Sequence, residues 1–121
     1  MSAAGAGPGR LGRRCYVVFA EPTARAGERA VATQAHLAYL ADLEAKGALF
    51  LAGPFVDEDG SSTGGGLFVL RAASLAEAEA LAAADPYHAC GYRSFRVAPW
   101  RLDQGAFELS VSLARSAVAF R

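Results

Sequence analysis

The sequence has few cysteines, no excess of either charge and no long apolar run. Its two cysteines, Cys15 and Cys90, lie far apart without a CxxC spacing, which disfavours a disulfide scaffold and favours buried, reduced thiols. Twelve basic residues balance twelve acidic ones, so the basic surface that nucleic acid or an anionic membrane requires is missing. No run reaches about 18 apolar residues, and residues 1–12 lack the apolar core of a signal peptide. These absences predict a cytoplasmic protein that binds neither nucleic acid nor a membrane.

The pattern of apolar residues predicts four strands and two helices. β-branched and aromatic residues favour strands over residues 15–20, 49–56, 67–70 and 92–98. A first helix is expected over residues 28–46, ending before Gly47. A second helix should begin at Ser74, because Ser74 and Glu77 have the spacing of a capping box, and should end before Pro86. The order βαββαβ is typical of a ferredoxin-like α+β sandwich.

We expect this domain to span residues 13–102, between two terminal segments. Residues 1–12, rich in Gly and Ala, predict a disordered leader. In residues 103–121, apolar residues alternate with polar ones from Phe107 to Leu113, and the alternation continues to Phe120. This pattern predicts a C-terminal β-hairpin extension, added to the sheet of this subunit or of a partner.

Three of the predicted strands are apolar on both faces. They contain residues 16–19, 49–51 and 67–70. Two helices cover only one face of a four-stranded sheet, and strands whose other face meets water should alternate between apolar and polar residues. An open apolar face of this size is normally an interface. We therefore expect a homodimer in which two sheets pack face to face as a dimeric α/β barrel.

His36 lies on the apolar face of the first predicted helix, with Leu40 and Leu43 on either side. Asp85 can approach it, because in this topology the first helix and the end of the second pack on the same sheet face. A carboxylate that accepts a hydrogen bond from one imidazole nitrogen fixes the tautomer and makes the other nitrogen more basic. The two residues are thus candidates for a catalytic proton-transfer site. A purely structural hydrogen bond between packed helices is the alternative, and spacing leaves both open.

Other residues are candidates for substrate binding around His36 and Asp85. Gly53 and Pro54 lie in the second predicted strand, and Tyr87 and Trp100 are large amphipathic residues near turns, a type that also serves in cores and interfaces. His88 could join the site or be an exposed loop residue. With His36 and Asp85 it could also form a set of metal ligands. The three residues are widely separated in the sequence, which supports a metal site only weakly, and we expect no metal.

Two further motifs resemble known ligand-binding patterns incompletely. Gly64-Gly65-Gly66 lies in a predicted hairpin rather than between a strand and a helix, which indicates a turn and not a phosphate loop. Phe68, in the third predicted strand, lacks the paired aromatics and leading basic residue of RNA-recognition domains. Neither motif therefore predicts a nucleotide or nucleic-acid site.

Over about residues 14–102 the chain resembles the YciI-like (YCII-related) family. The motifs that carry the resemblance are His36-Leu37 with Leu40, Gly47, Ala52-Gly53-Pro54-Phe55, Gly66, Asp85-Pro86-Tyr87 with Gly91, and Pro99-Trp100. The resemblance implies a ferredoxin-like fold, dimerisation as an α/β barrel and an active-site pair formed by His36 and Asp85. Characterised relatives include dehalogenases that eliminate chloride from chlorinated lactones or hydroxyhydroquinones without metal or organic cofactor.

Two functions from different classes follow. The first is a cofactor-independent enzyme in which His36, oriented by Asp85, moves a proton on a small lactone-like substrate, in an elimination (dehydrochlorination) or an isomerisation. The second is a non-catalytic dimeric module that binds a small ligand or a protein and regulates another process. The resemblance favours the enzyme, but no residue pattern names the substrate.

Overall fold

The computed structural model describes residues 11–120. These residues belong to two compact units, one formed by Arg14–Arg101 and the other by residues 11–13 and 102–120. The leader expected over residues 1–12 lies outside the described residues, except for Leu11 and Gly12. No helix in the described part of the chain is long and apolar enough to cross a membrane.

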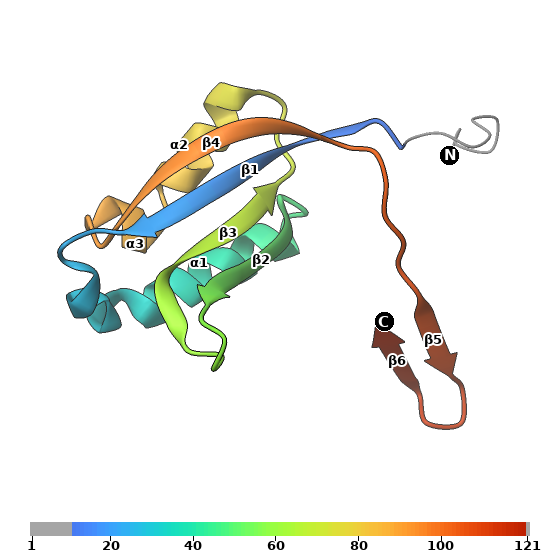
Figure 1. The fold of residues 1–121 in the computed structure, drawn as a ribbon. Helices are drawn as coiled ribbons and strands as arrows, with labels where there is room; N and C mark the ends of the chain where they lie inside the picture. The colour runs from blue at the N-terminus through green and yellow to red at the C-terminus, as the bar shows by residue number, and fades with distance from the viewer. Residues whose placement is uncertain (1–10, 121) are drawn as a thin grey trace. The chain divides into compact units, whose positions relative to one another are not determined.

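The larger unit is an antiparallel sheet with helices on one face (Figure 1). The strands have the order β2-β3-β1-β4, and β3 pairs antiparallel with both β2 and β1. This mixed α+β arrangement agrees with the predicted ferredoxin-like class. The elements are β1 (Arg13–Pro22), η2 (Ala26–Ala32), α1 (Thr33–Ala45), β2 (Leu49–Val56), β3 (Ser62–Leu70), α2 (Leu75–Ala83), α3 (Pro86–Ala89) and β4 (Arg93–Leu102).

The core lies between the sheet and the two longer helices. Alternate residues of β1 and β3 point toward the helices, as the period of two in a strand requires. α1 contributes Leu43, and α2 contributes Ala78 and Ala82, whose small side chains let this helix lie close to the sheet. The buried cluster is Tyr16, Val18, Leu43, Phe68, Leu70, Ala78 and Ala82.

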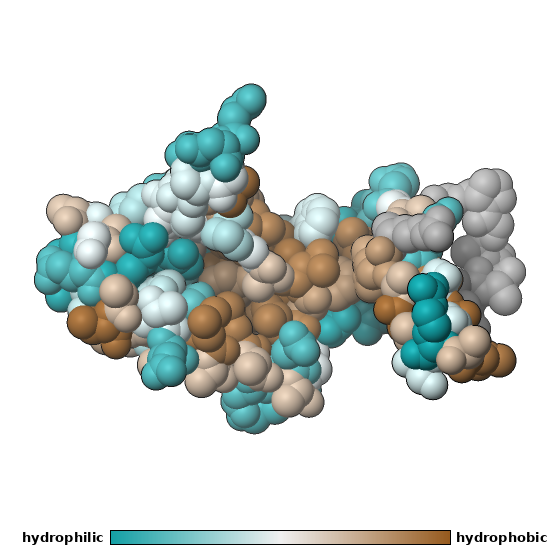
Figure 2. Space-filling model, turned by 90° about the horizontal axis from the view of Figure 1, so that it is seen from below, coloured by the Kyte–Doolittle hydropathy of each residue, from teal (hydrophilic) through white to brown (hydrophobic). Residues whose placement is uncertain are grey.

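The opposite face of the sheet also carries apolar residues. Val17 and Phe19 alternate with the core residues of β1 and therefore lie on this other face. Together with Leu67, Pro99 and Trp100 they surround a shallow hollow of about 270 Å³. Apolar residues also gather on the side of the molecule where β2 lies in Figure 1, as Figure 2 shows in the view from below.

The two predicted helix boundaries differ in how well they agree with the structure. At Ser74 the hydroxyl oxygen accepts the Glu77 N–H at 3.1 Å, so the predicted start of α2 is confirmed. The predicted helix over 28–46 is wrong in its first turns. Residues 26–32 form the 3₁₀ helix η2, and α1 begins only at Thr33, where no side chain caps the helix. A predicted N-terminus without a capping residue is poorly determined by local sequence.

Strand β3 is longer than predicted and begins at Ser62 rather than at residue 67. It includes the three glycines, and at two of them the neighbouring backbone leaves no room for a side chain. A Cβ atom on Gly65 would lie 2.5 Å from the Ala20 carbonyl oxygen, and one on Gly66 would lie 2.8 Å from the Gly53 carbonyl oxygen. Gly65 and Gly66 thus allow β3 to run close to both neighbouring strands, and the hairpin turn that was expected to contain the three glycines is shorter than predicted.

Two smaller expectations also need correction. The four-residue helix α3 was not predicted; Asp85 caps it and Pro86 occupies its first position, where proline is favoured. Cys15 is buried as expected, but the expectation is wrong for Cys90, which follows the end of α3 and is exposed.

In the smaller unit, β5 (Leu109–Ser112) and β6 (Ala117–Phe120) pair antiparallel as a two-stranded sheet. Leu109 faces Phe120 across the strands, and the Phe120 ring meets the edge of Phe107. The addition of this hairpin to the sheet of this subunit or of a partner stays a prediction.

Candidate active site

His36 and Asp85 form a buried hydrogen-bonded pair. The His36 Nδ1 atom lies 2.8 Å from Oδ1 and 2.9 Å from Oδ2 of Asp85. Asp85 is 0% exposed and His36 only 8%. An ionised carboxylate can only accept, so Nδ1 carries the hydrogen and donates it. The Nε2 atom of the neutral imidazole is then left with a lone pair that can accept a proton.

The position of Asp85 follows from the local sequence. Pro86 disfavours helical geometry at the preceding residue, and Asp85 adopts an extended backbone with φ −59° and ψ 126°. In this conformation its Oδ1 atom accepts the Tyr87 backbone N–H at 2.9 Å and caps α3. One carboxylate therefore caps the start of α3 and holds His36.

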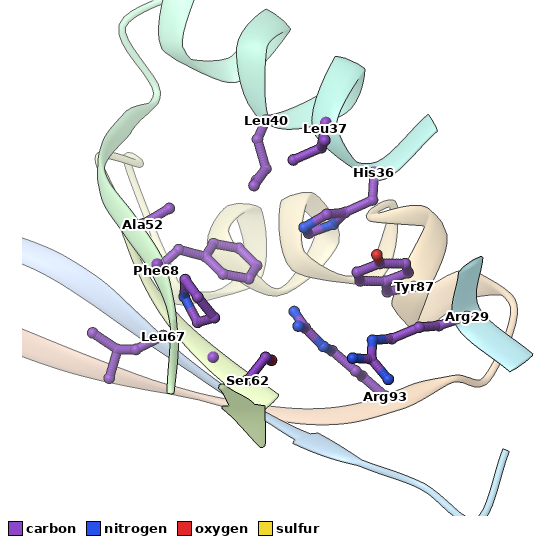
Figure 3. A pocket seen from close by; sticks show the side chains of 13 residues that line it. Arg29, His36, Leu37, Leu40, Ala52, Ser62, Leu67, Phe68, Tyr87 and Arg93 are labelled. Atoms are coloured by element: carbon purple, nitrogen blue, oxygen red, sulfur yellow. The ribbon is translucent and has the colours of Figure 1, made fainter. Parts of the chain in front are cut away.

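Tyr87 packs against one face of the imidazole ring. Its ring stacks on His36 with centroids 4.0 Å apart and planes 14° apart, and its hydroxyl lies 2.7 Å from the Thr33 hydroxyl. Figure 3 shows the Tyr87 ring between His36 and Arg93, whose guanidinium carbon lies 4.7 Å from the Tyr87 centroid. The imidazole is thus restrained by a hydrogen bond at Nδ1 and by stacking on one face, and its Nε2 atom has no hydrogen-bond partner in the described part of the chain.

A cavity of about 380 Å³ opens beside His36. Its walls come from η2, α1, β2, β3, α3 and β4, and most of them are apolar (Figure 3). The lining residues are Arg29, His36, Leu37, Leu40, Ala52, Gly53, Pro54, Ser62, Gly66, Leu67, Phe68, Tyr87 and Arg93. This volume is in the range of small-molecule sites.

The structure brings most of the predicted site residues to this cavity. His36, Tyr87, Gly53 and Pro54 line it, and Asp85 lies behind His36. Trp100 lies instead at the hollow on the opposite face of the sheet. Arg29 and Arg93 also line the cavity but were not predicted. The residues next to a single arginine in the sequence do not indicate which distant part of the chain its side chain contacts.

His88 also lies elsewhere. It is half-buried on α3, where Nδ1 lies 2.7 Å from the Ala82 carbonyl oxygen and the ring stacks on Phe95 at 4.5 Å. It is therefore neither an exposed loop residue nor one of the residues that line the cavity. Its Nε2 atom is buried and has no partner among the described residues. Burial lowers the pKa of His88 below its usual value. Within residues 11–120 no three His, Cys, Asp or Glu side chains gather as metal ligands.

Comparisons with known proteins place the fold. The structure matches the 5-chloro-2-hydroxyhydroquinone dehydrochlorinase from Burkholderia phenoliruptrix AC1100, solved in complex with 2,5-dihydroxybenzoquinone, with a TM-score of 0.60 and 22% sequence identity. The match covers 71% of this chain and 92% of that chain, and at this identity it shows a shared fold. A search of curated proteins finds no match. The family model of the YCII-related domain matches residues 15–101, which contain every residue of the cavity, and the chain therefore belongs to the YCII-related domain family.

Proposed function

We propose that the chain is a cofactor-independent enzyme in which His36 moves a proton on a small molecule bound in the cavity. The observation that carries this proposal is that the His36 imidazole is held at one nitrogen while its ring borders the cavity. Nδ1 is bound by the fully buried carboxylate of Asp85, and the ring forms part of the wall of a cavity of about 380 Å³. A general base needs this combination of a fixed tautomer and access to substrate.

The proposed reaction is an elimination or an isomerisation of a lactone-like or hydroxyquinol-like substrate. In the elimination from a chlorinated lactone, His36 Nε2 takes a proton from carbon, the C–H electron pair forms the new double bond, and chloride leaves with the electron pair of the C–Cl bond. In a chlorinated hydroxyquinol, one hydroxyl proton first moves to the carbon that bears chlorine, which gives the keto tautomer. His36 Nε2 then takes the proton of a second hydroxyl, the ring electrons shift to form the quinone, and chloride leaves with the electron pair of the C–Cl bond. In the isomerisation, His36 returns the proton to a different carbon. In both, Asp85 stabilises the imidazolium that forms. The dehydrochlorinase activity of the similar solved structure supports the elimination.

The test is the loss of turnover in His36→Ala. We expect chloride release from 5-chloro-2-hydroxyhydroquinone, or from a chlorinated lactone, to fall by at least about 100-fold, because a general base contributes about 10²–10⁴-fold. Gln34→Ala is the matched control, since Gln34 is exposed on the same helix. Activity retained in His36→Ala would refute the proposal. Saturable binding with no turnover in the wild type would favour the alternative, a non-catalytic binding module.

We also propose that the chain forms a homodimer through the face of the sheet opposite the helices. The exposed apolar surface of this face supports it, because Trp100 is 44% exposed in a hollow that it shares with the half-buried Phe19 and Leu67. Sedimentation at micromolar concentration should give a dimer, and Trp100→Glu should shift it toward monomer. Val31→Glu is the control, because Val31 is exposed on η2 and the same change there should leave the dimer intact. A monomeric wild type would contradict this proposal.

A further inference from the structure

Two guanidinium groups and no carboxylate line the cavity beside His36. Arg29 comes from η2 and Arg93 from the first position of β4, and Figure 3 shows both on the side of Tyr87 that faces away from His36. Among the described residues that line the cavity, none is Asp or Glu. The charged wall of the cavity is therefore entirely cationic, and the remaining walls are mostly apolar.

Arg93 is buried without an ion pair. The residue is only 9% exposed, and none of the ion pairs within residues 11–120 includes it. Its Nε atom donates to the Gly64 carbonyl oxygen at 2.7 Å, which fixes the guanidinium group but supplies no charge. Lys and Arg are rarely buried unless paired, because removing a charge from water is costly. Burial accordingly lowers the pKa of Arg93.

Arg29 brings a second positive charge to the same place. Its Nη1 atom donates to the Ala26 carbonyl oxygen at 2.9 Å and would lie 3.8 Å from a Cβ atom on Gly64, the residue that holds Arg93. The charge of Arg29 further lowers the pKa of Arg93, so the two groups repel each other. Folding thus holds two like charges together at the edge of a cavity. An anion bound in that cavity would offset the repulsion between them.

The carboxylate whose charge acts on Arg93 is already engaged. The negative charge of Asp85 opposes the effect of burial on Arg93. Both of its oxygens, however, accept from His36 Nδ1, and one also accepts from the Tyr87 backbone N–H. Because Asp85 is fully buried behind His36, it does not occupy the cavity in front of the guanidinium groups. The two arginines and one aspartate leave one net positive charge at the site, and protonation of His36 adds a second.

We propose that Arg93 is the anion-binding residue of this cavity, and that the substrate is a small planar acid whose anionic oxygen, a carboxylate or a phenolate, binds the terminal nitrogens of Arg93. Nε is occupied by Gly64, so Nη1 and Nη2 are the donors that remain. Gly66 keeps space beside them, since a Cβ atom there would lie 3.6 Å from Nη1. Arg29 adds charge, and the apolar residues Leu37, Leu40 and Phe68 face the hydrocarbon part of the ligand. The inference rests on the proposed function only in taking this cavity as the substrate site.

The experiment compares anions with neutral molecules of similar shape. Isothermal titration calorimetry on the full chain would use benzoate against benzamide, and 4-nitrophenolate against 4-nitroanisole, at a pH above the pKa of the phenol. We expect the anion of at least one pair to bind and its neutral counterpart to bind at least about 10-fold more weakly. The pair that responds identifies the anion as a carboxylate or a phenolate.

The variant is Arg93→Met, which keeps much of the apolar stem and removes the charge. A hydrogen bond to a charged group contributes about 1.5–3 kcal/mol, so binding of the anion should weaken about 10- to 100-fold. Arg71→Met is the matched control. It changes the net charge equally, but Arg71 is exposed and follows the far end of β3, roughly 20 Å from Gly64 along the strand.

Several results would overturn the inference. They are equal binding of the neutral partners, unchanged anion binding in Arg93→Met, equal losses in Arg71→Met, or no saturable binding of either anion. If Arg93→Met does not fold, Arg29→Met should weaken anion binding by a smaller factor, and no change there would overturn the inference too. Binding requires no turnover, so anion binding that depends on Arg93 in an inactive protein would refute the role of His36 and leave the anion site standing.

Discussion

Replacing Asp85 separates its structural role from its proposed catalytic role. In Asp85→Ala, α3 loses its N-cap, because the Tyr87 backbone N–H no longer has an acceptor. His36 Nδ1 loses the only acceptor that the structure gives it within the described residues. Both donors are in the interior, where water cannot readily replace the lost oxygen atoms. The substitution therefore removes two interactions and leaves two polar groups unsatisfied.

The magnitude follows from these two losses. Removal of an N-cap costs about 1 kcal/mol, and a buried donor left without an acceptor costs about 1–3 kcal/mol. Asp85→Ala should therefore lower the free energy of unfolding by about 2–4 kcal/mol. Asp85→Asn has nearly the same shape, and its amide oxygen can still accept from Tyr87 and His36. Its loss of stability should be smaller, about 1–2 kcal/mol.

Urea denaturation followed by circular dichroism measures both losses. Activity should fall in both variants, by at least about 100-fold in Asp85→Asn, because an amide cannot stabilise the imidazolium as a carboxylate does. A stability loss below about 0.5 kcal/mol in Asp85→Ala would refute the geometry described for the pair. Stability as expected, with wild-type activity in Asp85→Asn, would instead show that the pair is structural.

Three further predictions test the fold around the site. The pKa of His88 is lowered from its ordinary value of 6.5, so below that pH the folded protein binds fewer protons than the unfolded chain. The free energy of unfolding should therefore be fully retained above pH 6.5 and decrease as the pH falls below it. Urea titrations of His88→Phe at several pH values should not show this decrease. Gly65→Ala should lower the free energy of unfolding by more than about 2 kcal/mol, since its Cβ would meet backbone at 2.5 Å, whereas Gly27→Ala, with nothing within 4 Å, should change it little. Ser74→Ala should cost about 1 kcal/mol in the same assay, and an unchanged midpoint would contradict the observed cap.

Much of the fold could be predicted from the sequence, because the relevant signals are local. Ser74 and Glu77 determine the start of α2 through contacts within one turn. Gly47, with φ 78°, ends α1 in a conformation that disfavours other residues. The helical period placed His36 on an apolar face, and the Asp85-Pro86 sequence placed a carboxylate at a helix boundary. For these residues the neighbouring few positions contain the physical cause.

Tertiary structure alone decided the remaining features of the site. Arg93 reaches the cavity because Gly64, 29 positions earlier in the chain, accepts its Nε hydrogen bond, and no local pattern records that contact. His88 lies within a few residues of Asp85 yet turns toward Phe95, because α3 points it to the other side. By itself the sequence determined which residues carry the chemistry, through periodicity and caps. Which residues surround His36 depends on contacts between distant segments, and these contacts form only when the strands and helices pack.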